Sequence, residues 1–372
     1  MKKKRMLILL FIFIFFAISC SKEPGYPVRT KIIDGVTVIT NPEYPRDGHV
    51  TYQLEEELSI GEEEGDENYM FNQPQIVKAK EDGSIYVLDW RDICIKVYDR
   101  QGKYQRTIGQ QGQGPGEFSS GFLFFDISSD GKIYIMDCRN SCVIIMDKDG
   151  DFINSFRLPG RLFEEMKTDK NDFIYFDRTF TDEEARKMSI HRYNSNGHEI
   201  LNYGTFKIVQ PVIRRRTKSS ISSSTSRIAA TTVWIVDQEG KIYVGYGEKY
   251  QISVYDTNGS LSFKFGRDYT PILSKNYDGD PLHPKYVGVF SIITRHWFFD
   301  ENGNIWIETP PKEDIEEIAY DIFSPEGIYL KRTYLKYRIL HFKDGKAYSI
   351  VTTDEGFKVV KRFRMIEQGK GT

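Results

Sequence analysis

Short runs of apolar residues, many alternating with polar ones, recur along most of the chain, and each run ends at a turn. SIYVLD (84–89) is one such run, and CIKVYD (94–99) follows it after four residues. Runs of this length and alternation are typical of β-strands, whereas long patterns with the helical period are scarce. Aromatic residues make up 14% of the sequence, which also favours strands. The pattern predicts an all-β protein.

Three segments repeat in strict register, at residues 81–109, 129–156 and 238–266. In each copy a glycine precedes an aspartate by sixteen residues, and a second glycine follows that aspartate after three more. These residues are Gly83, Asp99 and Gly102; Gly131, Asp147 and Gly150; and Gly240, Asp256 and Gly259. Each unit thus has two turn signals between strands, which predicts an antiparallel meander of about four strands.

Weaker copies containing KNDFIYFD, ENGNIWIE and KDGKAYSI bring the number of units to six. The last copy lacks a fourth strand, and the N-terminal stretch ELSIGEEEGDENYMF (57–71) parallels QRTIGQQGQGPGEF (105–118) in the first unit. We therefore predict a six-bladed β-propeller of four-stranded antiparallel blades over residues 49–372, closed by an N-terminal strand and carrying an insertion at 205–229.

One run of the first unit, IYVLDWRDICIKVYDRQGKY (85–104), resembles the NHL-type propeller repeat. Followed by IGQQGQGPGEF (108–118), it is similar to the six-bladed β-propeller lipoproteins of bacterial envelopes, most of which have no assigned activity. The resemblance covers nearly all of the mature chain. The chain departs from the NHL pattern of Asn and Arg after the strand aspartate, with Asp92 and Cys94 in unit one, Cys142 in unit two and Gln251 in unit four.

The first nineteen residues combine four basic residues with an apolar run that is too short to favour a membrane span. Ser19 and Cys20 then resemble the lipobox of a bacterial lipoprotein, which implies that Cys20 is lipidated. We expect residues 1–19 to be a signal peptide, residues 20–48 a linker and tether, and the protein a monomeric outer-membrane lipoprotein of the cell envelope, facing the periplasm or the surface. Cys94, Cys138 and Cys142 remain, and the sequence leaves open whether they form a disulfide.

The stretch TIGQQGQGPGEF (107–118) has four glycines, but their spacing is not that of a phosphate-binding loop, and strands rather than a helix follow. We interpret it as the connection from the outer strand of one blade to the inner strand of the next. Glu117 is expected to orient this loop by accepting backbone hydrogen bonds.

The meander sorts the loops onto two rims of the ring. The regular glycine turns lie on one rim, and the irregular loops lie on the other, where propellers commonly bind ligands. We expect the candidate ligand-binding side chains on the irregular rim, with local structural roles as the alternative for each. These candidates are Trp90, Arg91, Arg139, Arg178, Tyr246, Lys249 and Asp354.

Charge excludes one class of partner. The formal net charge of −2 becomes −6 when the signal with its four basic residues is removed, which argues against nucleic acid. The acidic stretch 55–67 and the basic, serine-rich stretch 211–230 are interpreted as a solvated edge strand and a solvated loop. An acidic envelope partner for the basic stretch is the alternative.

Linear catalytic motifs are absent, and the six histidines have no metal-binding spacing. We therefore expect a non-catalytic binding or scaffold module for a glycan, peptide or protein partner, with no cofactor and no metal. The alternative is a propeller lyase or lactonase with its site at the channel mouth, in which a divalent metal such as calcium and residues such as Asp278 and Asp280 would take part.

Overall fold

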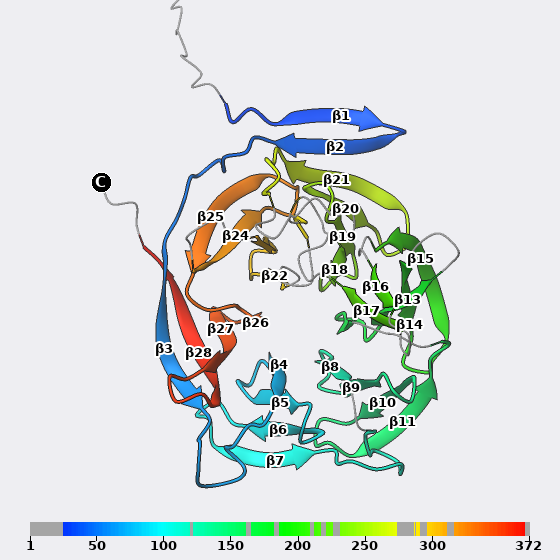
Figure 1. Ribbon diagram of the computed structural model, residues 1–372, viewed down its shortest axis with the longest axis vertical. Helices are drawn as coiled ribbons and strands as arrows, with labels where there is room; N and C mark the ends of the chain where they lie inside the picture. Colours follow the sequence, from blue (N-terminus) through cyan, green and yellow to red (C-terminus); the bar gives the residue numbers. More distant parts are fainter. Residues whose placement is uncertain are drawn as a thin grey trace, which may run out of the picture.

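The computed structural model describes residues 25–119, 122–160, 165–181, 186–208, 212–216, 221–225, 231–273, 286, 288–290, 296–310 and 316–368. Six antiparallel four-stranded units form a closed ring, with the first strand of each blade innermost (Figure 1). The predicted six-bladed, all-β architecture is thereby confirmed. No helix occurs in the described ranges, and hence no apolar helix of membrane-spanning length.

Blades one to three follow the order of the chain. Blade one contains β4 (Pro74–Ala79), β5 (Ile85–Asp89), β6 (Cys94–Tyr98) and β7 (Tyr104–Ile108). Blade two contains β8 (Leu123–Ile127), β9 (Ile133–Asp137), β10 (Cys142–Met146) and β11 (Phe152–Arg157). Blade three contains β12 (Met166–Thr168), β13 (Ile174–Thr181), β14 (Arg186–Tyr193) and β15 (Glu199–Lys207).

Blades four to six complete the ring. Blade four contains β18 (Thr232–Val236), β19 (Ile242–Tyr246), β20 (Gln251–Tyr255) and β21 (Leu261–Arg267). Blade five contains β22 (Phe298–Phe299), β23 (Ile305–Thr309), β24 (Ile318–Phe323) and β25 (Tyr329–Leu335). Blade six contains β26 (His341–Lys343), β27 (Lys346–Thr352), β28 (Lys358–Glu367) and the N-terminal β3 (Tyr52–Ile60).

The hydrophobic core lies between the blades. Among the described residues, six clusters of buried side chains each join two neighbouring blades, and together they cover all six interfaces of the ring. The second strands β5, β9 and β23 are buried along their whole length because other blades cover both of their faces. The outermost strand β11 is almost entirely exposed. This gradient from the inside to the outside explains why the second strands have the most apolar sequences.

The ring is closed by β3, as the sequence predicted. β3 pairs antiparallel with β28 from Tyr52–Glu367 to Ile60–Val360, with one bulge. The Glu57 carboxylate lies in that bulge and accepts hydrogen bonds from Lys346 at 2.6 Å and from the Arg364 Nε at 2.9 Å. Backbone pairing and these ion pairs therefore fasten an early segment of the chain to its last strand.

The N-terminal residues depart from the expected tether. β1 (Arg29–Ile33) and β2 (Val36–Asn41) form a hairpin, and β2 pairs in parallel with β21 (Figure 1). The hairpin thus extends the outer edge of blade four, so part of the 20–48 segment belongs to the propeller. The Asn41 side chain anchors it, since its amide donates to the carbonyls of Gly266 and Gly327, both at 2.8 Å.

Between β2 and β3 the chain runs along the outer edge of blade five. The Arg46 N–H donates to the Tyr329 carbonyl at 2.9 Å, and the Val50 N–H donates to the Arg332 carbonyl at the same distance. The N-terminal segment therefore contacts blades four, five and six in turn.

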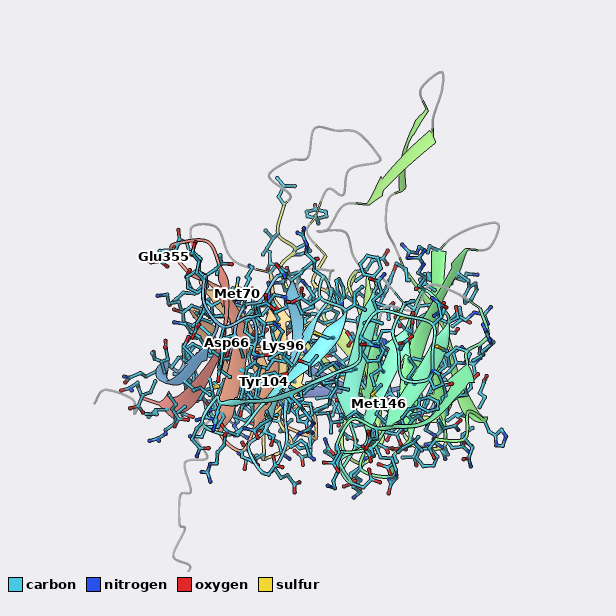
Figure 2. All side chains as sticks on the ribbon, turned by 90° about the horizontal axis from the view of Figure 1, so that it is seen from below. Asp66, Met70, Lys96, Tyr104, Met146 and Glu355 are labelled. Atoms are coloured by element: carbon cyan, nitrogen blue, oxygen red, sulfur yellow. The ribbon has the colours of Figure 1, made fainter. Side chains whose placement is uncertain are left out.

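The basic insertion also differs from the expected loop. β16 (Val212–Arg216) and β17 (Ile221–Thr225) pair as a two-stranded sheet. This hairpin projects from the ring between blades three and four (Figure 2).

Candidate functional site

The two rims are arranged as the meander predicts. Glu355, in the β27–β28 loop, and Met70, in the segment before β4, lie toward the side from which the β16–β17 hairpin projects (Figure 2). Tyr104 and Met146, beside the regular turns, lie toward the other side. The second-to-third loops and the interblade loops therefore share one rim, which we call the irregular rim.

Aspartates at the ends of the second strands shape this rim. Asp89 accepts the backbone N–H groups of Asn72 and Gln73 from the preceding interblade segment. Asp137 plays the same role in blade two, where it accepts the Ser119 N–H at 2.8 Å and the Arg139 N–H at 3.2 Å. Both carboxylates are fully buried. Since hydrogen bonds to an ionised acceptor are strong, each aspartate fixes two loops at once.

The glycine-rich loop is held by Glu117, as predicted. Its carboxylate accepts the Gly114 N–H at 2.7 Å and the Gln110 side-chain amide at 2.8 Å, and these bonds hold the pKa of Glu117 below its ordinary value. Gly109 has φ +75, and a Cβ there would lie 2.0 Å from the Phe118 ring. The loop therefore has one tightly packed path between blades one and two.

A polar groove lies between this loop and blade two. It consists of three hollows of about 290, 360 and 420 Å³, which share lining residues. The first and second share Arg139, the second and third share Asn140 and Arg157, and the first and third share Gln113. Because the hollows share these residues, we describe them as one surface, the blade-two groove.

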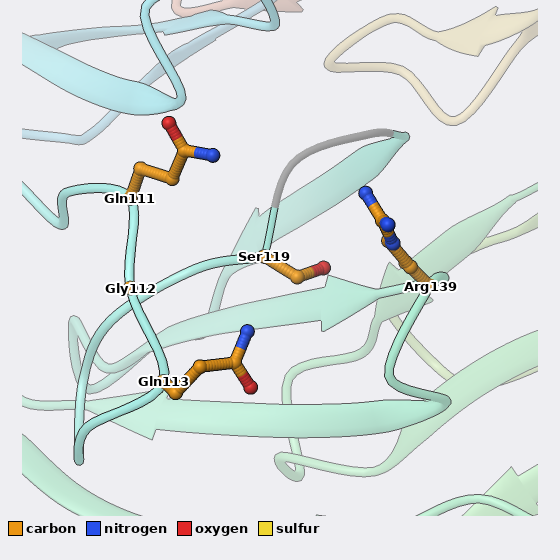
Figure 3. A pocket seen from close by; sticks show the side chains of 5 residues that line it. All are labelled: Gln111, Gly112, Gln113, Ser119 and Arg139. Carbon is orange, nitrogen blue, oxygen red and sulfur yellow. The ribbon is translucent and has the colours of Figure 1, made fainter.

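The lining of the groove changes along its length. At one end, Gln111 and Gln113 of the glycine-rich loop and Arg139 of the β9–β10 loop surround an open space (Figure 3). At the other end, Phe152 and Phe156 of β11 line the third hollow. One end of the groove is therefore lined by amide and guanidinium groups, and the other end is lined in part by aromatic rings.

Of the residues predicted from the sequence, Arg139 lines the groove and Arg178 lies at its border. A Cβ on Gly160, which lines the second hollow, would come within 2.6 Å of the Arg178 Nε. Arg91, Lys249 and Asp354 are exposed on the irregular rim but do not line these three hollows.

Trp90 lies at the interface of blades one and two. Its indole Nε1 donates to the Leu123 carbonyl at 2.7 Å, and its ring packs edge-on against Phe122 at 4.9 Å. Tyr246, at the end of β19, is half-buried, and burial raises the pKa of its hydroxyl. Trp90 thus has local packing partners at the blade interface, and Tyr246 is partly buried within the ring.

Several groove residues were not among the predicted candidates. Gln111 and Gln113 belong to a loop that we interpreted as purely structural, Asn140 follows Arg139 directly in the same loop, and Arg157 comes near Arg139 only in the folded blade. The clustering of three glutamines between the glycines of residues 109–114 was the available signal.

The described part of the chain contains neither a disulfide nor a grouped set of metal ligands. Cys94, Cys138 and Cys142 form no disulfide with one another, and burial raises the pKa values of Cys94 and Cys142 to about 11 and that of Cys138 to about 12. In the ranges that the structure describes, no three His, Cys, Asp or Glu side chains are grouped as a metal site. Cys20, Asp278 and Asp280 lie outside those ranges.

Comparison with known proteins agrees with this architecture. Residues 64–244 match a family described as a 6-bladed beta-propeller, DUF5128. The protein is a six-bladed β-propeller. No curated protein matches its sequence.

Solved structures resemble this propeller in fold. A predicted exported protein from Bacteroides fragilis is 11% identical, with a TM-score of 0.54 over 88% of this chain and 98% of that one. A DUF4221 protein from Bacteroides vulgatus is 12% identical, with a TM-score of 0.53 over 85% of this chain and 99% of that one. At these identities the likeness concerns the fold alone.

Proposed function

We propose that this propeller is a non-catalytic binding module of the cell envelope and that its blade-two groove takes an acidic glycan. The observation that carries the proposal is the continuous lining shared by the three hollows. Guanidinium groups bind carboxylates through paired hydrogen bonds, and amide side chains both donate to and accept from hydroxyl groups. Arg139 and Arg157 supply the first kind of contact, and Gln111, Gln113 and Asn140 supply the second.

The aromatic end of the groove fits the same ligand class. Phe152 is 40% exposed and lines the third hollow together with Phe156, so apolar surface is available at the end of a polar surface. A sugar ring has both a polar edge and an apolar face, so it could contact both parts. The length of three joined hollows suits an oligosaccharide better than a single sugar.

The carboxylate in the groove is poorly suited to acid catalysis. Glu117 lines the third hollow, but its hydrogen bonds to the Gly114 N–H and the Gln110 amide favour the ionised form. A general acid needs a raised pKa. Glu117 therefore supports the shape of the loop rather than a proton transfer.

Oligogalacturonate and neutral maltohexaose provide the test, with binding to the purified protein measured by calorimetry. We expect the acidic oligosaccharide to bind and Arg139→Ala to weaken binding by about 1.5–3 kcal/mol, the range for a hydrogen bond to a charged group. Arg91→Ala is the matched control, because it removes an exposed arginine from the corresponding loop of blade one. Equal binding by both variants, preference for the neutral sugar, or turnover of either sugar would contradict the proposal.

We further propose that the propeller is anchored to the outer membrane through lipidated Cys20. The support is the basic and apolar segment that ends at Ser19–Cys20. Two or more acyl chains suffice for stable attachment to a bilayer. The protein expressed with its signal should fractionate with membranes, and Cys20→Ser should release it or block its processing. Recovery of the unaltered protein as soluble material with an unmodified Cys20 would overturn the anchor.

A further inference from the structure

A second hollow lies on the same rim, away from the blade-two groove, between blades four and five. Its volume is about 340 Å³, near the lower limit for small-molecule sites. The two blades contribute Arg267 and Thr309, at the ends of β21 and β23, and Arg332, in the middle of β25, and the N-terminal segment contributes Glu43 and Tyr44. Three separate parts of the chain therefore meet around it.

The charges behind this hollow do not balance. Asp321 is fully buried and is shared by two arginines, with the Arg267 Nε at 2.8 Å and the Arg332 Nη1 at 3.1 Å from its two oxygens. Burial alone would raise the pKa of Asp321, but the two arginines hold it below its usual value, so the carboxylate is ionised. Both guanidinium groups are also more than nine-tenths buried. The cluster therefore carries one surplus positive charge, which is costly to bury without a partner.

The neighbouring carboxylates do not supply that partner. The Asp268 side chain pairs with Arg29, Asp47 pairs with Arg46, and Glu308 pairs with Arg338. Glu43 lines the hollow but is exposed at its edge. The ion pairs of the described residues thus join Arg267 and Arg332 to Asp321 alone.

Counting donors shows where an anion could bind. All three nitrogens of the Arg332 guanidinium have acceptors, namely the Tyr334 hydroxyl, Asp321 and the Thr309 hydroxyl. Arg267 uses its Nε for Asp321 and its Nη1 for the Asp268 carbonyl at 3.0 Å. Its Nη2 donates to no described residue. One nitrogen of a nearly buried cation therefore has no acceptor among the described residues, in a side chain that lines the hollow.

Aromatic rings fix the position of this donor. The Arg267 guanidinium lies 4.4 Å from the ring centre of Tyr250, 5.4 Å from that of Tyr269 and 5.5 Å from that of Tyr329. The hydroxyl groups of Tyr250 and Tyr329 donate to Asp321 at 2.7 and 2.6 Å. The cation is thus held in a preorganised geometry, which lowers the entropic cost of binding.

From this arrangement we propose a second ligand site, the Arg267 hollow, for a small monocarboxylate with an apolar or aromatic body. A single charge is favoured because one surplus positive charge and one free nitrogen are present, and because Asp321 and Glu43 repel a more highly charged anion such as phosphate. The apolar body would pack against Tyr44, Tyr269, Ile272 and Pro310, which line the hollow together with His49 and Thr270.

The test uses three probes with the full mature protein: phenylacetate, its neutral analogue phenylacetamide and inorganic phosphate. We expect phenylacetate to bind and to raise the melting temperature, and the other two to bind at least about tenfold more weakly, the value of a charge-assisted hydrogen bond. Tight binding of phenylacetamide would show an apolar site, and preference for phosphate would show a different anion class. Either result, or no binding of phenylacetate, overturns the proposal.

Two variants assign the site. Arg267→Lys keeps the charge but loses the planar donor set, so we expect weaker phenylacetate binding in a protein that still folds. If that variant does not fold, Glu43→Gln decides, because removing a negative charge at the exposed edge should tighten phenylacetate binding several-fold. Unchanged affinity in Glu43→Gln would contradict the assignment. Arg139→Ala should leave phenylacetate binding unaltered, and a loss there would place the carboxylate in the blade-two groove instead.

Discussion

At the residue scale, the ionisable side chains in the interior of this propeller are of two kinds, those that accept many hydrogen bonds and those that make few. Asp89 and Asp137 are buried but accept several backbone N–H groups, which replace the lost hydration. His341 represents the other kind. It lies where blade six meets blade one, and its Nε2 contacts the Ala79 carbonyl at 3.3 Å. Burial, helped by the nearby Lys78, lowers its pKa to about 3.

His341 should therefore make the stability of the ring depend on pH. The ordinary pKa of a histidine is 6.5, so below that pH the imidazole becomes protonated in the unfolded chain. In the folded chain it becomes protonated only near pH 3. Stability must fall as the pH drops through this window. When the pH is lowered from 7 to 5, the free energy of unfolding of the unaltered protein should decrease by about 2 kcal/mol more than that of His341→Gln. Urea denaturation at the two pH values measures this difference. His198→Gln, at an exposed position, is the control and should behave like the unaltered protein.

At the element scale, the repeated blades could be predicted from the sequence because their turns are encoded locally. The DG and DxxG signals specify hairpins whatever the distant residues are. The β1–β2 hairpin contains such a signal, Asp34–Gly35, with φ of 50° and 79°. It was missed because it stands outside the repeat and because its pairing partner, β21, lies more than two hundred residues away. Long-range pairing of this kind leaves no local pattern.

The candidate site was predictable only in part for a related reason. Arg139 follows directly from its place in a second-to-third loop. Gln113 and Arg157 line the groove only because the glycine-rich loop takes one particular path over blade two. That path depends on the packing of Gly109 against Phe118 and on Glu117, which are contacts within the folded loop.

Gly109→Ala should test whether this loop path is fixed by packing. A Cβ at Gly109 meets the Phe118 ring as well as an unfavourable φ, whereas a Cβ at Gly345, with φ +69, meets nothing within 4 Å. Gly345→Ala should therefore cost about 1 kcal/mol of unfolding free energy for the backbone alone, and Gly109→Ala about 1–3 kcal/mol more for overpacking. Chemical denaturation gives both values. Equal losses would mean that the loop adjusts freely around Phe118.

At the scale of the whole molecule, ring closure depends on a strand that is distant in sequence from the rest of its blade. β3 supplies the outer strand of blade six, and the segment before it crosses the edge of blade five. The N-terminal segment thus acts on stability through two separable parts, the β1–β2 hairpin and the closing strand.

Two truncations distinguish these parts. Removal of residues up to Thr40 deletes the hairpin but keeps β3, and we expect a modest decrease in melting temperature. Removal up to Gly61 also deletes β3 and exposes the edge of β28, so the protein should melt much lower and aggregate. Calorimetry and light scattering provide the measurements. If both truncated proteins melt at the same temperature, β3 does not contribute to closure.

The docking of the β1–β2 hairpin on blade four also sets how far the propeller can move from a bilayer. If Cys20 carries lipid, only eight residues lie between it and Arg29, the first residue of β1. A fully extended chain spans at most about 3.5 Å per residue, so the segment from Cys20 to Arg29 can span at most about 30 Å. A free segment up to residue 48 could instead span about 100 Å. The propeller would then stay within a thin layer next to the membrane. The outer edge of blade four would be the part of the ring attached most closely to the bilayer, because β2 pairs with β21 there. Any ligand it captures would have to come within that layer.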